Sequence, residues 1–445
     1  MSVLEAGDPD RVALREPSGD SGLTARALGD EVSRLAGAFA GAGIERGDRV
    51  ALVLPNGPAF VQALLGVTAL GAAAAPLNPA YTTEEFAFYL DDLAPRALVL
   101  PAGEAGAARA AAPERTIVLD AELPEGAVQL TGAGRTRPFE PADPDDVALL
   151  LHTSGTTSRP KQVPLRHRNL VASARAIAAH YAFTPEDVSF SVMPLFHVHG
   201  LVASVLAPLA AGGAVIAPRR LSAGAFWPSL SDDAVTFFSA SPTLLTMLLD
   251  QRPDGAPAPA LRFVRSCSAA LPGDLYARIE SELGVPVLQA YGMTEASHQI
   301  SSNPLPPARR AAESVGVATG TAIATLDASG QELPAGTPGE VAVRGPGVTS
   351  GYLANEQANA EAFVHGWFRT GDRGVVDADG YLTLEGRIKE LIIRGGENIS
   401  PYEVEDVLRP IRRWRTRRAS ACRTRNTARS SERRSSSARR PSRAS

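Results

Sequence analysis

Hydroxyl side chains, a glycine and a lysine are concentrated in the segment TSGTTSRPK, residues 153–161. Backbone amides of a glycine-containing turn, together with hydroxyl groups and a lysine ammonium, form a favourable site for a polyphosphate. The segment follows the apolar run VALLL, so we expect it to leave the end of a buried strand. It does not fit the GxxxxGK[ST] pattern, because TTSRPK follows Gly155. The residues therefore predict a different phosphate-binding loop, with an ordinary strand-to-helix turn as the alternative.

Four further motifs follow along the chain: PLFHVHG (194–200), YGMTE (291–295), GWFRTGD (366–372) and GRIKELIIRGGENISPYEVE (386–405). In this order, the five motifs resemble those of the acyl-adenylate-forming superfamily, which includes acyl-CoA synthetases, adenylation domains and luciferases. The stretches HTSGTTSRPK, PLFHVHGL, FWPSL, RSCSAAL and SSNPLP are most similar to oxalate–CoA ligases of plants and fungi. The resemblance covers residues 1 to about 408. It implies a ligase that forms an acyl-adenylate from ATP and a carboxylic acid, and then an acyl-CoA.

The resemblance also implies which residues bind ATP. The loop residues that would grip the β- and γ-phosphates are Thr153, Ser154, Gly155, Thr156, Thr157 and Lys161. The other ATP-binding residues would be Ser268, Ala269, Tyr291, Thr294, Asp372 and Arg387. Tyr291 would lie against the adenine, Asp372 would accept from both ribose hydroxyls, and Arg387 would reach the ribose or a phosphate. The implied catalytic residues are Lys161, Thr294, Glu295 and His197.

A magnesium ion is implied as well, with Glu295 and Thr156 as the metal-linked residues. Mg²⁺ prefers one or two carboxylates together with phosphate oxygens, so a single glutamate suffices. Lys389 would be the hinge about which a C-terminal domain swivels between the two half-reactions. Ser158 and Gln162 stand where glycine is the commoner residue. Gln162 is expected to stiffen the loop.

Polar residues in the segments that line the acyl site of relatives predict a small polar acid as substrate. They are His197, His199, Arg265, Ser266, Ser268 and His298. A short dicarboxylate needs donors for its far carboxylate, and a site built for it should reject apolar chains. Oxalate is therefore the first candidate, with His197 as the gate at the reacting carboxylate. A fatty acid, or an aryl acid of the 4-coumarate kind, is the alternative, and a structural role is the alternative for each histidine.

Helical and strand-like stretches alternate up to about residue 315, which predicts parallel βαβ units. We expect an α/β fold in which residues 1–386 form an AMP-binding N-terminal domain of two doubly wound αβ subdomains. An antiparallel β subdomain is expected over about residues 316–386, where short strands and turns replace the alternation. Residues 387–408 would be the hinge and the start of a C-terminal α/β lid domain, which is expected to be truncated.

The charge is distributed unevenly between the two ends of the chain. Residues 409–445 carry 14 arginines and one acidic residue, a net charge of +13, so the other 408 residues carry 30 basic and 47 acidic side chains, a net charge of −17. We interpret this Arg/Ser-rich segment as an aberrant, disordered tail, the product of a frameshift that replaces a genuine C-terminal domain. The alternative is a catalytically impaired nucleotide-binding remnant whose basic tail binds nucleic acid. The acidic body opposes that contact, so we expect no nucleic-acid partner.

Lysine occurs only at positions 161 and 389. The catalytic lysine that the family carries near its C-terminus is therefore absent, and its loss is expected to cost several kcal/mol of the barrier. The chain lacks a secretory signal and an apolar stretch able to cross a bilayer. Its two cysteines form no disulfide or metal pattern. These features favour a cytoplasmic enzyme whose partners are ATP, Mg²⁺, coenzyme A and a small carboxylic acid.

Overall fold

The computed structural model describes residues 4, 6–17, 22–123, 128–153, 160–256 and 259–390, together with the backbone of four short strands. These strands are β22 (Ile392–Arg394), β23 (Glu397–Ile399), β24 (Ala421–Arg423) and β25 (Arg429–Ser431). The tail predicted over residues 409–445, and most of the hinge segment predicted over residues 387–408, otherwise lie outside the described residues.

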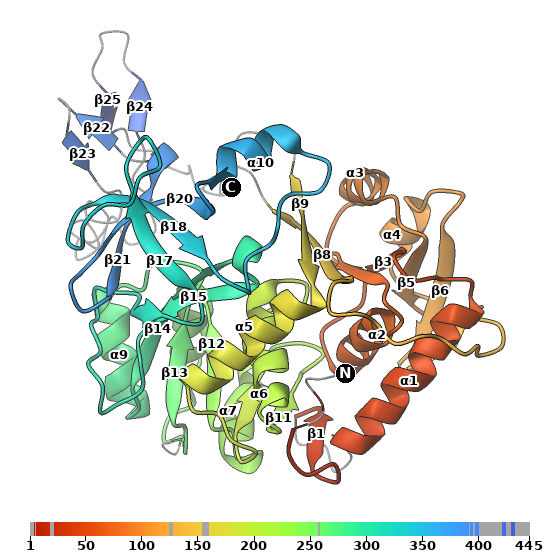
Figure 1. The fold of residues 1–445 in the computed structure, drawn as a ribbon. Helices are drawn as coiled ribbons and strands as arrows, with labels where there is room; N and C mark the ends of the chain where they lie inside the picture. The colour runs from red at the N-terminus through yellow and green to blue at the C-terminus, as the bar shows by residue number, and fades with distance from the viewer. Residues whose placement is uncertain are drawn as a thin grey trace, which may run out of the picture.

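Two large sheets dominate the fold (Figure 1). The first has nine strands in the order β16-β15-β14-β13-β12-β10-β11-β1-β2. The strands from β14 to β1 pair in parallel, whereas β2, β15 and β16 are antiparallel. Its strands are β1 (Val12–Arg15), β2 (Gly22–Thr24), β10 (Val188–Phe190), β11 (Ala214–Ile216), β12 (Phe237–Ala240), β13 (Phe263–Ser266), β14 (Val287–Met293), β15 (His298–Ser302) and β16 (Val317–Ala318). The central strands are short and almost wholly buried, as expected for a parallel sheet covered on both faces.

The second sheet has seven strands in the order β7-β6-β5-β3-β4-β8-β9. The strands from β6 to β8 pair in parallel, and β7 and β9 pair antiparallel at the edges. The strands are β3 (Arg49–Leu52), β4 (Ala73–Pro76), β5 (Ala97–Pro101), β6 (Ile117–Glu122), β7 (Gln129–Thr131), β8 (Val147–Thr153) and β9 (Lys161–Arg166). The phosphate-loop motif therefore connects β8 to the edge strand β9, which turns back along it.

Helices connect the parallel strands. They are α1 (Ala25–Gly41), α2 (Pro58–Ala69), α3 (Thr83–Leu93), α4 (Gly106–Ala110), α5 (His167–His180), α6 (Ala207–Ala210), α7 (Ala223–Asp232), α8 (Pro242–Asp250), α9 (Gly273–Leu283) and α10 (Glu356–Ala362). Three further helical segments are the π-helical η1 (His199–Leu206) and the 3₁₀ turns η2 (Thr294–Ala296) and η3 (Ile388–Glu390). Capping side chains determine where several of these helices begin. At α3, for example, Thr82 and Glu85 form a capping box. Within the described residues, no helix combines the length and the hydropathy that a bilayer span requires.

A third sheet is antiparallel, in the order β17-β18-β20-β19, with β21 paired to β20. Its strands are β17 (Ala322–Leu326), β18 (Gly339–Arg344), β19 (Phe363–Val364), β20 (Trp367–Val376) and β21 (Leu382–Arg387). Gly380 adopts φ +84° in the turn between β20 and β21, as the DADG sequence predicts. The pattern of strands and turns did not predict α10, which begins where the Asn355 side chain accepts from the Ala358 amide.

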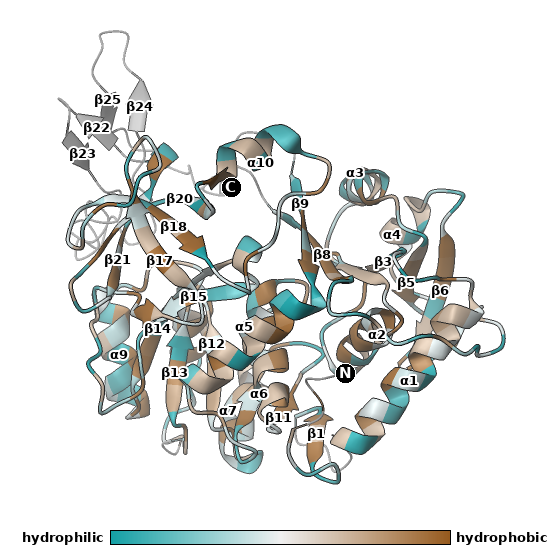
Figure 2. Cartoon of the chain, viewed as in Figure 1, coloured by the Kyte–Doolittle hydropathy of each residue, from teal (hydrophilic) through white to brown (hydrophobic). Residues whose placement is uncertain are grey.

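One contiguous apolar core joins the three sheets. It contains Leu14 and Val215 from the first sheet, Val50 and Leu149 from the second, and Val341 from the third. Figure 2 shows apolar residues concentrated along the strands and on the inner sides of the helices, with polar residues on the outer side of α1. The predicted α/β fold with an antiparallel β part is confirmed.

Candidate active site

The predicted site residues lie where strands end. Thr153 ends β8, Ser266 ends β13, and Tyr291 lies near the end of β14. Open α/β sheets bind their ligands outside the carboxyl ends of parallel strands, because the loops there leave backbone groups free. Asp372 and Arg387 come from the third sheet, where they pair across β20 and β21.

The ends of the predicted phosphate loop are held by the pairing of β8 with β9. Thr153 pairs with Lys161, and the Thr153 hydroxyl lies 3.5 Å from the Lys161 carbonyl oxygen. The predicted phosphate-gripping residues between them, which are Ser154, Gly155, Thr156 and Thr157, lie outside the described residues. Lys161 is half-buried, and its Nζ lies 4.5 Å from the centre of the Tyr352 ring.

Gln162 ties the loop to helix α3. Its Nε2 donates to the backbone oxygen and to Oδ2 of Asp92, each at 2.7 Å. The same Oδ2 lies 3.0 Å from Nε2 of His152, which is the cross-strand partner of Gln162. Asp92 therefore clamps the two strands one residue outside Thr153 and Lys161. A glycine at position 162 would lack this clamp, which is consistent with the stiffening expected from the sequence.

Glu295 has the surroundings expected of a metal-linked carboxylate. It is 6% exposed in the turn η2, and its Oε1 accepts from the Tyr352 hydroxyl at 2.8 Å. In the described part of the chain no basic side chain pairs with it. The described residues also contain no group of three or more His, Cys, Asp or Glu side chains placed to hold a metal ion. This donor set fits Mg²⁺ held by one carboxylate and substrate phosphates better than an all-protein cage.

Tyr291, Asp372 and Arg387 form one connected group. The Tyr291 hydroxyl donates to Oδ2 of Asp372, and Nε of Arg387 lies 2.8 Å from Oδ1. Burial raises the pKa of the Asp372 carboxyl, and the charge of Arg387 opposes that rise. Asp372 is 6% exposed, whereas Arg387 is exposed at the end of β21. The group can present carboxylate oxygens to a ribose beside an aromatic ring.

A buried arginine, Arg265, connects several of the residues predicted to line the acyl site. It is 1% exposed on β13, and no carboxylate pairs with it in the described part of the chain. Its Nη1 lies 3.2 Å from Nε2 of His199, and its Nη2 lies 2.8 Å from Nε2 of His298. Its other hydrogen-bond partners are the Tyr181 hydroxyl, Oε1 of Gln299 and Oγ of Ser239.

These contacts determine which ring nitrogens carry protons. Arg265 can only donate, so Nε2 of His298 accepts. Nε2 of His199 also lies 2.7 Å from the Ser239 hydroxyl, which accepts from Arg265 and can donate its own proton to that nitrogen. We therefore assign the proton of each ring to Nδ1. Nδ1 of His199 then donates to Oγ of Ser268 at 2.8 Å. The Ser268 hydroxyl is left as a donor on an exposed residue, and the Nδ1–H of His298 is a second donor. Each hydrogen bond of this network is therefore donated in the direction that leads away from Arg265.

The backbone is strained at the same place. Ser268, Ser297 and His298 adopt φ values of +75°, +51° and +94°, which side-chain-bearing residues rarely adopt. A Cβ at Gly292 would lie 1.9 Å from the carbonyl oxygen of His298, so only glycine fits there. Strain of this kind costs about 1–3 kcal/mol per residue and is concentrated at functional sites.

The remaining predicted residues take varied positions. Ser266 is 2% exposed, and its hydroxyl has no hydrogen-bond partner among the residues that the structure describes. His197, Ala269 and Lys389 are exposed, and Thr294 is half-buried at the start of η2. None of these five side chains makes a hydrogen bond or ion pair with another predicted site residue in the described part of the chain. Their roles stay predictions.

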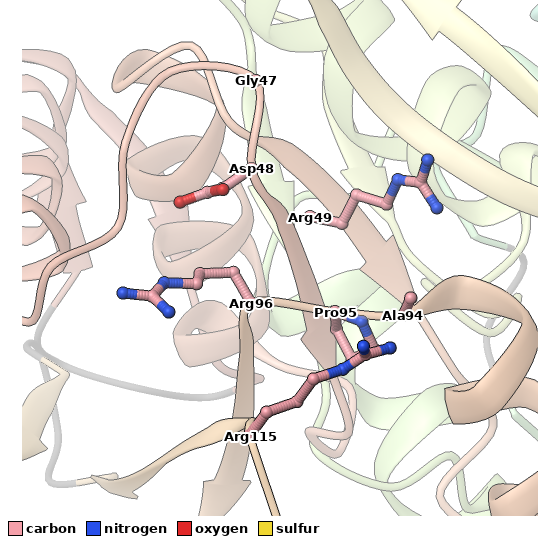
Figure 3. Close-up of a pocket in the computed structure, with 7 residues that line it drawn as sticks. All are labelled: Gly47, Asp48, Arg49, Ala94, Pro95, Arg96 and Arg115. Atoms are coloured by element: carbon pink, nitrogen blue, oxygen red, sulfur yellow. The ribbon is translucent and has the colours of Figure 1, made fainter. Parts of the chain in front are cut away.

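A basic cavity of about 390 Å³ lies at the opposite, amino-terminal edge of the second sheet (Figure 3). Arg49, Arg96 and Arg115 line it near the starts of β3, β5 and β6. Arg49 donates to the Leu93 carbonyl at the end of α3 at 2.8 Å, and Arg96 reaches the Gly43 carbonyl beyond α1 at 3.4 Å. Guanidinium groups there stabilise helix C-termini. Two of the three arginines therefore have a role at helix ends.

The buried histidines should make the fold sensitive to acid. Burial, and next the charge of Arg265, hold the pKa values of His199 and His298 well below the usual value, so both are neutral when folded. In the unfolded chain they bind protons below about pH 6.5. Their stabilisation is therefore fully present above that pH and is lost as the pH falls. At pH 5.5, about one unit below that value, the loss is on the order of 1 kcal/mol for each histidine.

Urea unfolding at pH 7.5 and 5.5 measures this loss. His298→Gln is expected to reduce the difference, because one of the titrating groups is gone. Equal midpoints at the two pH values would contradict the expectation.

Several residues of the site were missed by the sequence analysis. Tyr352, Asp92, Tyr181, Ser239 and Gln299 contact the predicted residues but belong to none of the predicted sets. Gln299 follows His298 directly and Tyr352 lies in the stretch SGYL, so position in the sequence was the only available signal. The others reach the site through folding alone.

Comparison with known proteins identifies the family. Residues 4–353 match the family model described as AMP-binding enzyme. The chain is 46% identical over 420 residues to an oxalate–CoA ligase of Arabidopsis thaliana, covering 90% of this chain and 80% of the relative. It is 40% identical over 436 residues to an oxalate–CoA ligase of Saccharomyces cerevisiae, with 90% and 80% covered.

A solved structure supports the same family assignment. The o-succinylbenzoate coenzyme A synthetase of Bacillus subtilis, in complex with ATP and a magnesium ion, superposes with a TM-score of 0.82 at 29% identity. The match covers 95% of this chain and 86% of that chain. The predicted resemblance, the ligase class and the use of ATP, Mg²⁺ and coenzyme A are confirmed. The chain belongs to the AMP-binding enzyme family and is an acid–thiol ligase that works through an acyl-adenylate.

Proposed function

We propose that this ligase activates oxalate, or another acid of similar size with two anionic groups. The observation that carries the proposal is the buried Arg265, which has no carboxylate partner in the described part of the chain. A buried cation is costly without a compensating anion. A substrate with a second carboxylate would supply the missing negative charge.

The donors suit such a substrate. The distal carboxylate would accept from the Ser268 hydroxyl and from Nδ1–H of His298, while Arg265 acts from behind the two histidine rings. His199 and His298 lie parallel, with ring centres 4.9 Å apart and an interplanar angle of 16°, so both present an edge in one direction. A fatty or aryl acid would leave these donors unpaired, which costs affinity.

The reacting carboxylate and ATP would be held by the other residues. Lys161 and Thr294 would donate to the phosphates, and Asp372 would hold the ribose. A magnesium ion bound at Glu295 would neutralise phosphate charge and stabilise the leaving pyrophosphate. We keep His197 as the gate beside the reacting carboxylate, Lys389 as the hinge of a swivelling C-terminal domain, and the cytoplasm as the compartment.

The named relatives support the proposal, because both are oxalate–CoA ligases and each covers nine tenths of this chain. The fatty- or aryl-acid alternative requires an apolar pocket. The described residues at the predicted acyl site are instead an arginine, histidines and serines.

Pyrophosphate release with oxalate, malonate, hexanoate and 4-coumarate tests the proposal. Oxalate is expected to exceed the two apolar acids by about 100-fold or more, since buried donors left unpaired discriminate strongly. The panel is run on this chain and on a version with the C-terminal frame restored, because the absent lysine is expected to slow the first. A reversed ranking would reject oxalate. Nucleotide binding without pyrophosphate release in either version would support the impaired remnant.

A further inference from the structure

We propose that Tyr352 is a positioning residue that holds Lys161 and Glu295 ready for the triphosphate of ATP. The inference rests on the proposed function, which places Lys161 at the phosphates and Glu295 at the magnesium ion. Tyr352 lies between β18 and α10 and is 8% exposed.

One side chain touches both of these groups. The Tyr352 hydroxyl donates to Oε1 of Glu295 at 2.8 Å, and Nζ of Lys161 lies 4.5 Å from the centre of the ring. The hydroxyl limits the rotation of the carboxylate, and the face of the ring attracts the ammonium through its quadrupole. Lys161 begins β9 and Glu295 lies in η2, so Tyr352 joins two elements that are far apart in the sequence.

The phenol keeps its proton under ordinary conditions. Burial, and next the negative charge of Glu295, raise the pKa of Tyr352 well above its usual value. The 2.8 Å contact is therefore a hydrogen bond that the Tyr352 hydroxyl donates to the Glu295 carboxylate. Oε1 of Glu295 accepts this hydrogen bond, and its second carboxylate oxygen can serve a cation.

The side chain of Asn359 in helix α10 holds the backbone of Tyr352 in place. The Tyr352 amide donates to Oδ1 of Asn359 at 2.7 Å, and Nδ2 of Asn359 donates to the Tyr352 carbonyl at 2.9 Å. A Cβ at Gly351 would lie 3.1 Å from Oδ1 of Asn359, and Gly351 has φ +149°, so glycine allows this close approach.

The neighbours of Tyr352 bind the same two elements. The Thr349 amide donates to the Glu295 carbonyl at 2.7 Å, and the Leu353 amide donates to the Gln162 carbonyl at 2.9 Å. Segment 349–353 therefore holds both partners through its backbone, and Tyr352 adds the contacts to their charged ends. Groups ordered before the ligand arrives lose less entropy when it binds.

Calorimetry on the full chain tests the role, with MgATP and AMP as the two ligands. AMP lacks the β- and γ-phosphates, so it should not depend on Lys161 or on the metal. Tyr352→Phe is expected to weaken MgATP binding about tenfold, because it removes a hydrogen bond to a charged group. Tyr352→Leu should weaken it roughly threefold further, because the ring under the ammonium is also lost. AMP affinity should stay within about twofold in both variants.

Tyr381→Phe is the matched control. The Tyr381 hydroxyl donates to the Arg309 carbonyl at 2.6 Å, and the Arg309 guanidinium lies 4.8 Å from the ring centre. Tyr381 therefore also donates a hydrogen bond and contacts a cation with its ring, but it does not touch Lys161 or Glu295. The affinities of Tyr381→Phe for MgATP and for AMP should both be unchanged. Wild-type MgATP affinity in Tyr352→Phe, or an equal loss of AMP affinity, would overturn this inference alone. Failure of the unmodified chain to bind MgATP would overturn the proposed function as well.

Discussion

Replacing Arg265 with lysine is expected to lower oxalate-dependent pyrophosphate release by about 100-fold or more, because preorganised donors are lost from the site. Lysine keeps the charge, but its three N–H donors radiate from one nitrogen and do not reproduce the planar fork whose two Nη atoms reach His199, His298 and Gln299. The tautomers of the two histidines are then no longer fixed, and the donors at Ser268 and His298 lose their direction. Pyrophosphate release with oxalate is measured for the substitution in this chain and in the version with the C-terminal frame restored.

The matched control is Arg262→Lys. Nη1 of Arg262 lies 2.6 and 2.7 Å from the two carboxylate oxygens of Asp187, just before β13. A lysine can keep this ion pair, so the oxalate rate should change little. MgATP affinity within about twofold of the unmodified chain would show that Arg265→Lys is folded. An unchanged oxalate rate in Arg265→Lys would contradict the role given to the buried guanidinium.

Lys161→Met is expected to weaken MgATP binding by about 100-fold and AMP binding by less than about twofold, since one charge-assisted contact to the phosphates is removed. Methionine retains much of the apolar stem, so the packing against Tyr352 is largely kept. Calorimetry with MgATP and with AMP measures the two losses of affinity separately. The stability of the variant should be close to that of the unmodified chain.

Lys389→Met is the control that the composition provides, because the chain has only one other lysine. It makes the same chemical change at an exposed residue of η3, so MgATP affinity should be unchanged. Equal losses of MgATP and AMP affinity in Lys161→Met would contradict a contact specific to the phosphates.

Much of the fold could be predicted because its signals are local. The run VALLL before the loop predicts a strand, and β8 spans Val147–Thr153. DADG predicts a tight turn, and Gly380 takes the left-handed conformation. The order of motifs likewise led to Tyr291, Asp372 and Arg387, which the structure brings into contact.

The supporting residues could not be predicted, because they depend on strand order. Ser239 on β12 and Gln299 on β15 meet Arg265 only because the sheet places β13 and β14 between those strands. Tyr181, which follows α5, joins them from a third segment. Tyr352 reaches Glu295 across a separation of 57 residues. No local periodicity contains information on such neighbours.

The two lysines differ in their surroundings, with Lys161 half-buried against Tyr352 and Lys389 exposed. Every other side chain of the lysine and arginine class is a guanidinium, which stays protonated and is a poor nucleophile. Acyl thioesters react with free amines, so ligases of this kind are exposed to covalent modification by what they make. Among the described residues, this protein therefore offers an acyl thioester one exposed side-chain amine, that of Lys389.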